Sequence, residues 1–258
     1  MFRISRPSPS PEEVYSSSLA TLHLGHALLY PEPHKSGEPQ IGDVGFFHHG
    51  AFVRLFNLDT SSPEKKVTFW PTPFENIEPL PPGVLHIDSR RLPFVPGHYC
   101  SHGVERREVN ASADVTAGVA SISYNPSAEY TCKAAKGAVL TLRSEAYIEK
   151  IFGNNLLEKY ILRNHDNWYA YVKNIALQDV EREDLVFVSG WVKTTADWMI
   201  TIFQGTNTHS RRSPEISRHG EGYLGDPLGE TKRHQCLFVS GYKVRRRFGV
   251  VRDVASID

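Results

Sequence analysis

Two histidines and a cysteine alternate in the segment His98-Tyr-Cys-Ser-His102. On a β-strand, residues i, i+2 and i+4 share one face, so His98, Cys100 and His102 would point the same way. Imidazole and thiolate groups are ligands that zinc prefers, so this spacing is compatible with a zinc site. Tetrahedral zinc sites usually draw on two spaced pairs of ligands, and no second pair is evident in the sequence. The competing interpretation is a turn with two exposed histidines and a buried thiol.

Nucleophilic catalysis is the second chemistry that these residue types allow. A cysteine nucleophile needs a base and an orienting group that the fold brings together. Cys100 has His98 and His102 as sequence neighbours, and His165 is a more distant candidate base. The chain contains no Gly-x-Ser-x-Gly motif, so a serine hydrolase of that kind is not indicated. A hydrolase that uses Cys100 with nearby histidines, or with a metal held by them, stays an alternative.

A third pattern lies in residues 185–203, where two apolar runs flank a polar turn at Lys193-Thr-Thr195. A phosphate-binding loop places one glycine immediately before its lysine and another five residues before that glycine. Val192 stands immediately before Lys193 here, and the earlier position falls on Phe187. The aromatic and β-branched residues from Trp198 onwards favour a strand. The segment is therefore predicted to be a β-hairpin with Lys193, Thr194 and Thr195 at its exposed tip.

Composition limits the class of protein. Among 258 residues, Lys+Arg and Asp+Glu are both 29, so the formal net charge is zero. General nucleic-acid binding proteins usually carry a basic surplus, so the balanced charge argues against nucleic acid as a partner. The local basic elements at 211–212, 232–233 and 243–247 leave an acidic partner or an anionic membrane surface open. No apolar run approaches the ~18 residues of a membrane-spanning helix, and three scattered cysteines suit reduced thiols in the cytoplasm.

The residue patterns predict an α+β fold on a mainly antiparallel β-sheet or sandwich. Proline and serine are frequent in residues 1–18, which are expected to form a disordered leader. Residues 19–258 are expected to form one α+β domain, with a sub-division near 70–100 where prolines concentrate. Helical spacing of apolar residues predicts a central helical pair at about 145–173. Two strands within 41–58 are expected to join across His48-His-Gly50.

Several blocks of the chain resemble an uncharacterised protein family that is abundant in mushroom-forming (basidiomycete) fungi. The resemblance covers nearly the whole chain after residue 19 and rests on residues 24–33, 41–47, 50–52, 54–57, 137–140, 167–169, 188–198 and 235–247. The family has no established activity or catalytic residue, so the resemblance assigns no role to any position. Its members form large paralogous sets, which suits recognition or defence more than core metabolism.

The leading hypothesis from the sequence is a non-enzymatic cytoplasmic recognition or scaffold domain with no cofactor. Its ligand, a protein or a small molecule, is not specified by any motif. The β-rich build, the aromatic-rich loops and the lack of a complete catalytic set favour this interpretation. The alternatives are the hydrolase described above and a membrane-acting, pore-forming-like defence protein that meets anionic lipid through its loops and basic strand.

Overall fold

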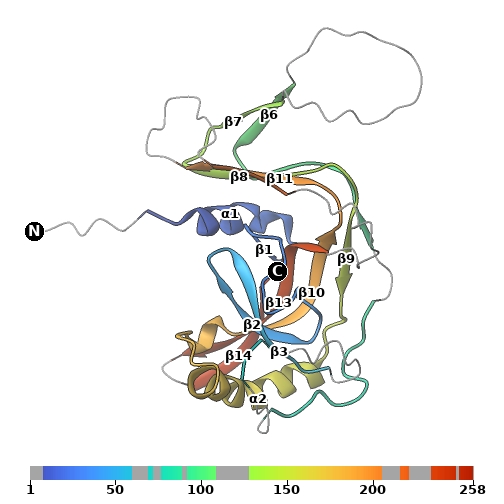
Figure 1. The fold of residues 1–258 in the computed structure, drawn as a ribbon, viewed down its shortest axis with the longest axis vertical. Helices are drawn as coiled ribbons and strands as arrows, with labels where there is room; N and C mark the ends of the chain where they lie inside the picture. The colour runs from blue at the N-terminus through green and yellow to red at the C-terminus, as the bar shows by residue number, and fades with distance from the viewer. Residues whose placement is uncertain are drawn as a thin grey trace, which may run out of the picture.

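Antiparallel β-sheet is the main secondary structure of the part of the chain that the structure describes (Figure 1). The computed structural model describes residues 8–59, 69–71, 77–88, 92–108, 128–204, 216–220, 234–247 and 250–257. The strands are β1 (His26–Ala27), β2 (Asp43–His48), β3 (Ala51–Asn57), β4 (Leu92–Phe94), β5 (Gly97–Cys100), β6 (Val104–Glu108), β7 (Ala128–Cys132), β8 (Lys136–Leu142), β9 (Ala146–Lys150), β10 (Val186–Thr194), β11 (Trp198–Gln204), β12 (Ile216–Gly220), β13 (Gln235–Arg247) and β14 (Val250–Ser256). The prediction of an α+β fold on mainly antiparallel sheet is confirmed.

The described strands make two sheets and a separate ribbon. The larger sheet has the order β1-β13-β10-β2-β3, with β14 beside β13, β9 beside β10 and β4 beside β9. The smaller sheet has the order β12-β11-β8-β5, and β6 pairs with β7. Figure 1 shows the smaller sheet above the larger one, with β6 and β7 projecting beyond it.

One strand pair bends from the smaller sheet into the larger one. β8 pairs with β11 in the smaller sheet, and their continuations β9 and β10 pair in the larger sheet. At the bend the Arg143 N–H donates to the Asp197 carbonyl at 3.4 Å, and Thr194 Oγ1 donates to the Glu145 carbonyl at 3.4 Å. Strands that switch sheets make corners of this kind. The predicted hairpin over 185–203 is therefore wrong in its pairing, because β10 and β11 lie in different sheets.

Helix α1 (Pro11–Leu19) lies between the two sheets (Figure 1). It begins with a capping box in which Ser10 Oγ accepts from the Glu13 N–H and the Glu13 carboxylate accepts from the Ser10 N–H. Its inner face is buried in a cluster with side chains of β8, β11 and β13. The prediction of a disordered leader is thus wrong for 11–18, because proline and serine here start a helix. Residues 1–7 lie outside the described part of the chain.

Helix α2 (Asn155–Asn174) packs against the opposite face of the larger sheet. The Asn154 side chain caps it by accepting from the Leu157 N–H at 2.9 Å. The Trp168 ring is buried and stacks on Phe187 of β10 with centroids 6.5 Å apart. The second helix of the predicted pair is confirmed, but the first is strand β9. That segment pairs with β10 on one side and β4 on the other, so sheet hydrogen bonds satisfy its backbone.

The hairpin of β2 and β3 confirms the turn predicted at residues 48–50 and holds a buried ion pair. Arg54 Nε lies 2.9 Å from Asp43 Oδ1, and both side chains are almost fully buried. The Asn57 amide donates to the same oxygen at 2.6 Å, and the Gln40 N–H donates to Asp43 Oδ2 at 2.6 Å. Burial raises the pKa of Asp43, and these three donors act against that rise.

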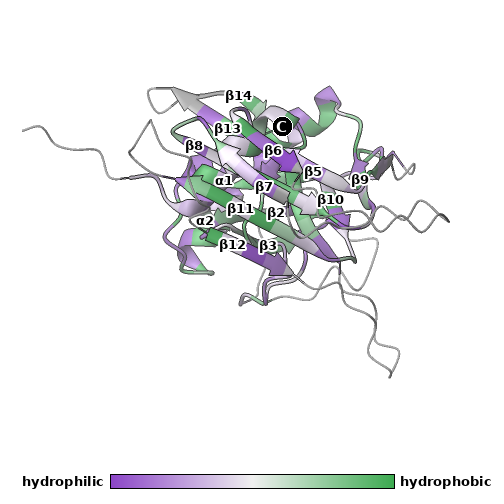
Figure 2. Ribbon diagram, turned by 90° about the horizontal axis from the view of Figure 1, so that it is seen from above, coloured by the Kyte–Doolittle hydropathy of each residue, from purple (hydrophilic) through white to green (hydrophobic). Residues whose placement is uncertain are grey.

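The ribbon of β6 and β7 covers part of the outer face of the smaller sheet. Val104 and Cys132 of the ribbon pack with Val139 of β8 and Phe203 of β11 in a small apolar cluster. Figure 2 looks down onto this side of the molecule, with β6 and β7 in front of the smaller sheet. None of the described helices has the length and apolar character that crossing a membrane requires.

Candidate functional site

A row of four side chains crosses the outer face of the smaller sheet, which is the face turned away from α1. In the strand register His98 of β5 lies opposite Thr141 of β8, Thr141 opposite Met199 of β11, and Met199 opposite His219 of β12. The residues before and after Thr141 and Met199 are buried in the cluster with α1. Because successive side chains of a strand point to opposite faces, the row points outwards.

A tyrosine from the β6–β7 ribbon closes one end of this row. The Tyr130 hydroxyl lies 2.6 Å from His98 Nδ1 and 3.3 Å from Thr141 Oγ1. Thr141 Oγ1 is itself 3.0 Å from His98 Nδ1. The three groups thus form one hydrogen-bonded cluster that joins β5, β7 and β8. This cluster fixes Thr141 at the point where the row meets a pocket.

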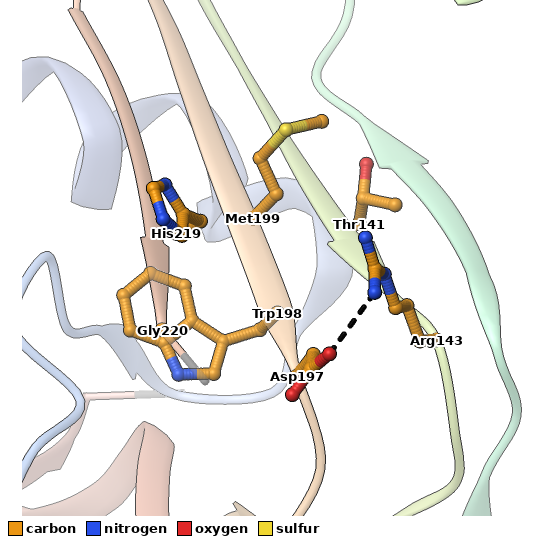
Figure 3. A pocket seen from close by; sticks show the side chains of 7 residues that line it. All are labelled: Thr141, Arg143, Asp197, Trp198, Met199, His219 and Gly220. Carbon is orange, nitrogen blue, oxygen red and sulfur yellow. Dashed lines mark hydrogen bonds and ion pairs between the residues drawn. The ribbon is translucent and has the colours of Figure 1, made fainter. Parts of the chain in front are cut away.

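The pocket has a volume of about 260 Å³ and lies where β8 and β11 approach the bend between the sheets (Figure 3). Thr141, Met199 and His219 of the row line it, together with Arg143, Asp197, Trp198 and Gly220. Arg143 Nη1 lies 3.0 Å from Asp197 Oδ2, with the two side chains 48% and 39% exposed. In Figure 3 this ion pair stands on one side of the pocket and His219 on the other, with Met199 between them.

Trp198 supplies a rigid wall to the pocket. Its side chain is 1% exposed, and its indole N–H donates to the Gln235 side chain of β13. Gly220 lies against the ring, and a Cβ at that position would come within 2.4 Å of it. The close approach of β12 to Trp198 therefore depends on glycine. The contact also brings the neighbouring His219 to the pocket.

The residues predicted to bind zinc do not form a metal site in the structure. His98 and Cys100 lie on the outer face of β5, while His102 lies in the exposed turn that follows. Among the described residues there is no group of three or more His, Cys, Asp or Glu side chains arranged to hold a metal ion. His98 and His219 stand three strand spacings apart, about 14 Å at about 4.8 Å each, so they do not converge either.

The predicted exposed tip is wrong for Lys193 and Thr194. Strand β10 continues through Thr194, and Lys193 is only 3% exposed. Lys193 Nζ lies 3.5 Å from Glu38 Oε1 and 4.6 Å from the centre of the Trp191 ring. Thr195 is half-buried and belongs to the connection between the two sheets. The polar Lys-Thr pattern suggests a turn, but partners from β9 and β13 on both sides keep the chain extended.

The remaining candidates from the sequence are separated in space. His165 is buried in α2, which packs on the larger sheet, whereas Cys100 belongs to β5 of the smaller sheet. Figure 1 shows α2 and the smaller sheet at opposite ends of the molecule. Of the basic elements, 211–212 and 232–233 lie outside the described residues, and Lys243 Nζ lies 3.4 Å from Asp184 Oδ1. The pocket residues Arg143, Met199 and His219 were not predicted. Met199 and His219 lie in strands and Arg143 directly follows one, but nothing local in the sequence shows which strands are neighbours.

Replacing Tyr130 with phenylalanine is expected to lower the free energy of unfolding by about 0.5–1.5 kcal/mol. The change removes the hydroxyl that contacts both His98 and Thr141 and leaves the ring in place. Equilibrium urea unfolding would measure the difference. Tyr147→Phe is the matched control. Tyr147 is 42% exposed, so removing its hydroxyl should change the free energy of unfolding very little. Equal effects from both variants would contradict a structural role for the cluster.

Comparison with known proteins gives no match, whether with a family model, a curated protein or a solved structure. The resemblance to the fungal family therefore stays a prediction.

Proposed function

We propose that this chain is a non-enzymatic recognition domain and that the pocket at the bend is its ligand-binding site. The observation that carries this proposal is the exposed Arg143–Asp197 ion pair in a cavity of about 260 Å³. The cavity is built on two paired strands whose other face is buried against α1. Arg143 and Asp197 stand immediately beyond the ends of these strands, where the Arg143 N–H donates to the Asp197 carbonyl, so the packed strands limit the movement of the pair. Such a site is suited to recognition through fixed hydrogen bonds.

The described cysteines support binding over covalent catalysis. Burial raises the pKa of the Cys100 thiol and raises the pKa of Cys236 to about 12. Both groups are therefore protonated at neutral pH, whereas the thiolate is the form that acts as a nucleophile. All three cysteines, Cys100, Cys132 and Cys236, are free thiols. Free thiols suit a reducing compartment, so an intracellular location is part of the proposal.

A binding screen with matched variants tests the proposed site. The purified protein would be heated with neutral sugars, amino acids, dicarboxylates and nucleotides, each in a separate thermal-shift assay. A ligand at one hundred times its Kd raises the free energy of unfolding by about 2.7 kcal/mol. For a protein of this size, this increase raises the Tm by about 5–10 °C. We expect one class of ligand to raise the Tm of the wild type by this amount and to leave the Tm of Asp197→Asn unchanged.

The control variant is Asp166→Asn, which breaks a similarly exposed ion pair between Asp166 of α2 and Arg182, away from the pocket. It should retain the ligand effect in full. A ligand that stabilises Asp197→Asn as well as the wild type would place the binding site elsewhere. Hydrolysis of a simple ester by the purified protein, if it disappears in Cys100→Ala, would overturn the proposal in favour of the hydrolase alternative.

A further inference from the structure

We infer that the pocket takes a neutral, polyhydroxylated ligand of about the size of one monosaccharide; this inference rests on the pocket being the binding site. Its charge is the first reason. Arg143 and Asp197 are one cation and one anion 3.0 Å apart on the same wall. An anionic ligand at Arg143 would meet the repulsion of Asp197, and a cationic ligand at Asp197 would meet that of Arg143. A neutral ligand meets neither repulsion.

The hydrogen-bonding groups of the pocket are the second reason. A guanidinium is only a donor and a carboxylate is only an acceptor, and here the two stand side by side. Each hydroxyl of a polyol can both donate and accept, so two adjacent hydroxyls match this pair, one giving its proton to Asp197 and the other accepting from Arg143. Hydrogen bonds to charged partners are about twice as strong as those between neutral groups. Thr141 and His219 extend the polar lining along the same sheet.

Size and apolar lining are the third reason. Pockets for drug-sized ligands have volumes of roughly 300–1,000 Å³, and this one has about 260 Å³. It therefore suits a ligand of a single ring. Met199 stands between the ion pair and His219 in Figure 3 and offers an apolar surface for the C–H face of such a ring. Trp198 is 1% exposed, so its indole supports the wall and is not available for open stacking.

Nuclear magnetic resonance with ¹⁵N-labelled protein tests the ligand class directly. The neutral probes are glucose, galactose, mannose, N-acetylglucosamine and myo-inositol, each titrated to about 50 mM. The charged probes are inorganic phosphate, glutamate and lysine at the same ionic strength. We expect at least one neutral probe to shift the backbone amide signals of Thr141, Met199 and His219 in a saturable way. In Asp197→Asn the affinity should fall at least about tenfold, which corresponds to about 1.4 kcal/mol.

The other outcomes separate the ligand class from the site. Saturable shifts at the same amides with phosphate, glutamate or lysine, and none with the neutral probes, would overturn the polyol inference and leave the pocket as the binding site. Shifts with a neutral probe that are unchanged in Asp197→Asn would overturn it as well, because the ion pair would then play no part. Absence of any shift with every neutral probe also rejects it, and the broader thermal screen then decides whether the pocket binds another class. Asp166→Asn serves again as the control that should behave like the wild type.

Discussion

Asp43→Asn is expected to lower the free energy of unfolding by about 3–5 kcal/mol, because it leaves the buried Arg54 charge without its counter-ion. Both carboxylate oxygens of Asp43 accept hydrogen bonds or face the guanidinium. An asparagine would turn an NH₂ group towards one of these donors. The measurement is urea unfolding at pH 8, above the value of about 7 to which burial raises the pKa of Asp43, so that most of the carboxylate is ionised in the folded protein.

Two further variants make this expectation specific to the buried pair. In the double variant Asp43→Leu, Arg54→Met both charges are gone, so part of the lost stability should return. Glu105→Gln breaks the ion pair with Lys133, in which both side chains are more than half exposed, and should cost less than about 1 kcal/mol. If Asp43→Asn lowers the free energy of unfolding no more than Glu105→Gln does, the buried pair does not stabilise the β2–β3 hairpin.

Gly25→Ala is the second change with a large expected effect, because it should lower the free energy of unfolding by roughly 2–5 kcal/mol. Gly25 has a φ of +108°, a conformation that costs an L-residue about 1–2 kcal/mol. An added Cβ would also lie 2.4 Å from the Val239 carbonyl oxygen, and relieving such overpacking costs about 1–3 kcal/mol. Because Gly25 precedes β1, the new methyl group would push that strand away from β13. Thermal and urea unfolding would measure the loss.

Gly83→Ala is the matched control for the backbone strain alone. Gly83 has a φ of +78°, but a Cβ there would meet no atom within 4 Å. The free energy of unfolding of Gly83→Ala should therefore fall only by the backbone strain, about 1–2 kcal/mol. If Gly25→Ala costs no more than Gly83→Ala, the contact with Val239 does not restrain β1. A larger loss with reduced amide protection in β1 and β13 would confirm the mechanism.

The candidate site was only partly predictable from the sequence. His98 was recognised as a residue with chemistry, and a strand was one of the two interpretations that the sequence left open for its segment. Its partners in the structure, Tyr130 and Thr141, lie 32 and 43 residues away along the chain. The spacing of histidines and a cysteine suggested a metal ligand set, but His102 leaves the strand at the following turn. Spacing within one segment cannot reveal which side chains arrive from other strands.

Helix α1 and the connection at 195–197 also show that local sequence signals do not decide the tertiary arrangement. The capping box at Ser10 and Glu13 was present in the sequence, yet a short proline- and serine-rich segment is also typical of disorder. What decides between them is the burial of Val14, Tyr15 and Leu19 between the sheets. The sequence predicted a polar turn at 193–195, whereas the structure places the connection at 195–197. A turn between two strands also does not determine whether those strands pair with each other.

By itself the sequence determined the local structure where periodicity and turn chemistry agree. The antiparallel β-rich class, the β2–β3 hairpin with its glycine turn and the helix from 155 to 174 belong to this group. Only the tertiary structure decided that β8–β9 and β10–β11 bend together from one sheet to the other, that Lys193 is buried, and that Arg143, Asp197 and His219 line one pocket. The physical reason is that alternation specifies which face a side chain takes, whereas long-range strand pairing depends on burial and loop closure over the whole chain.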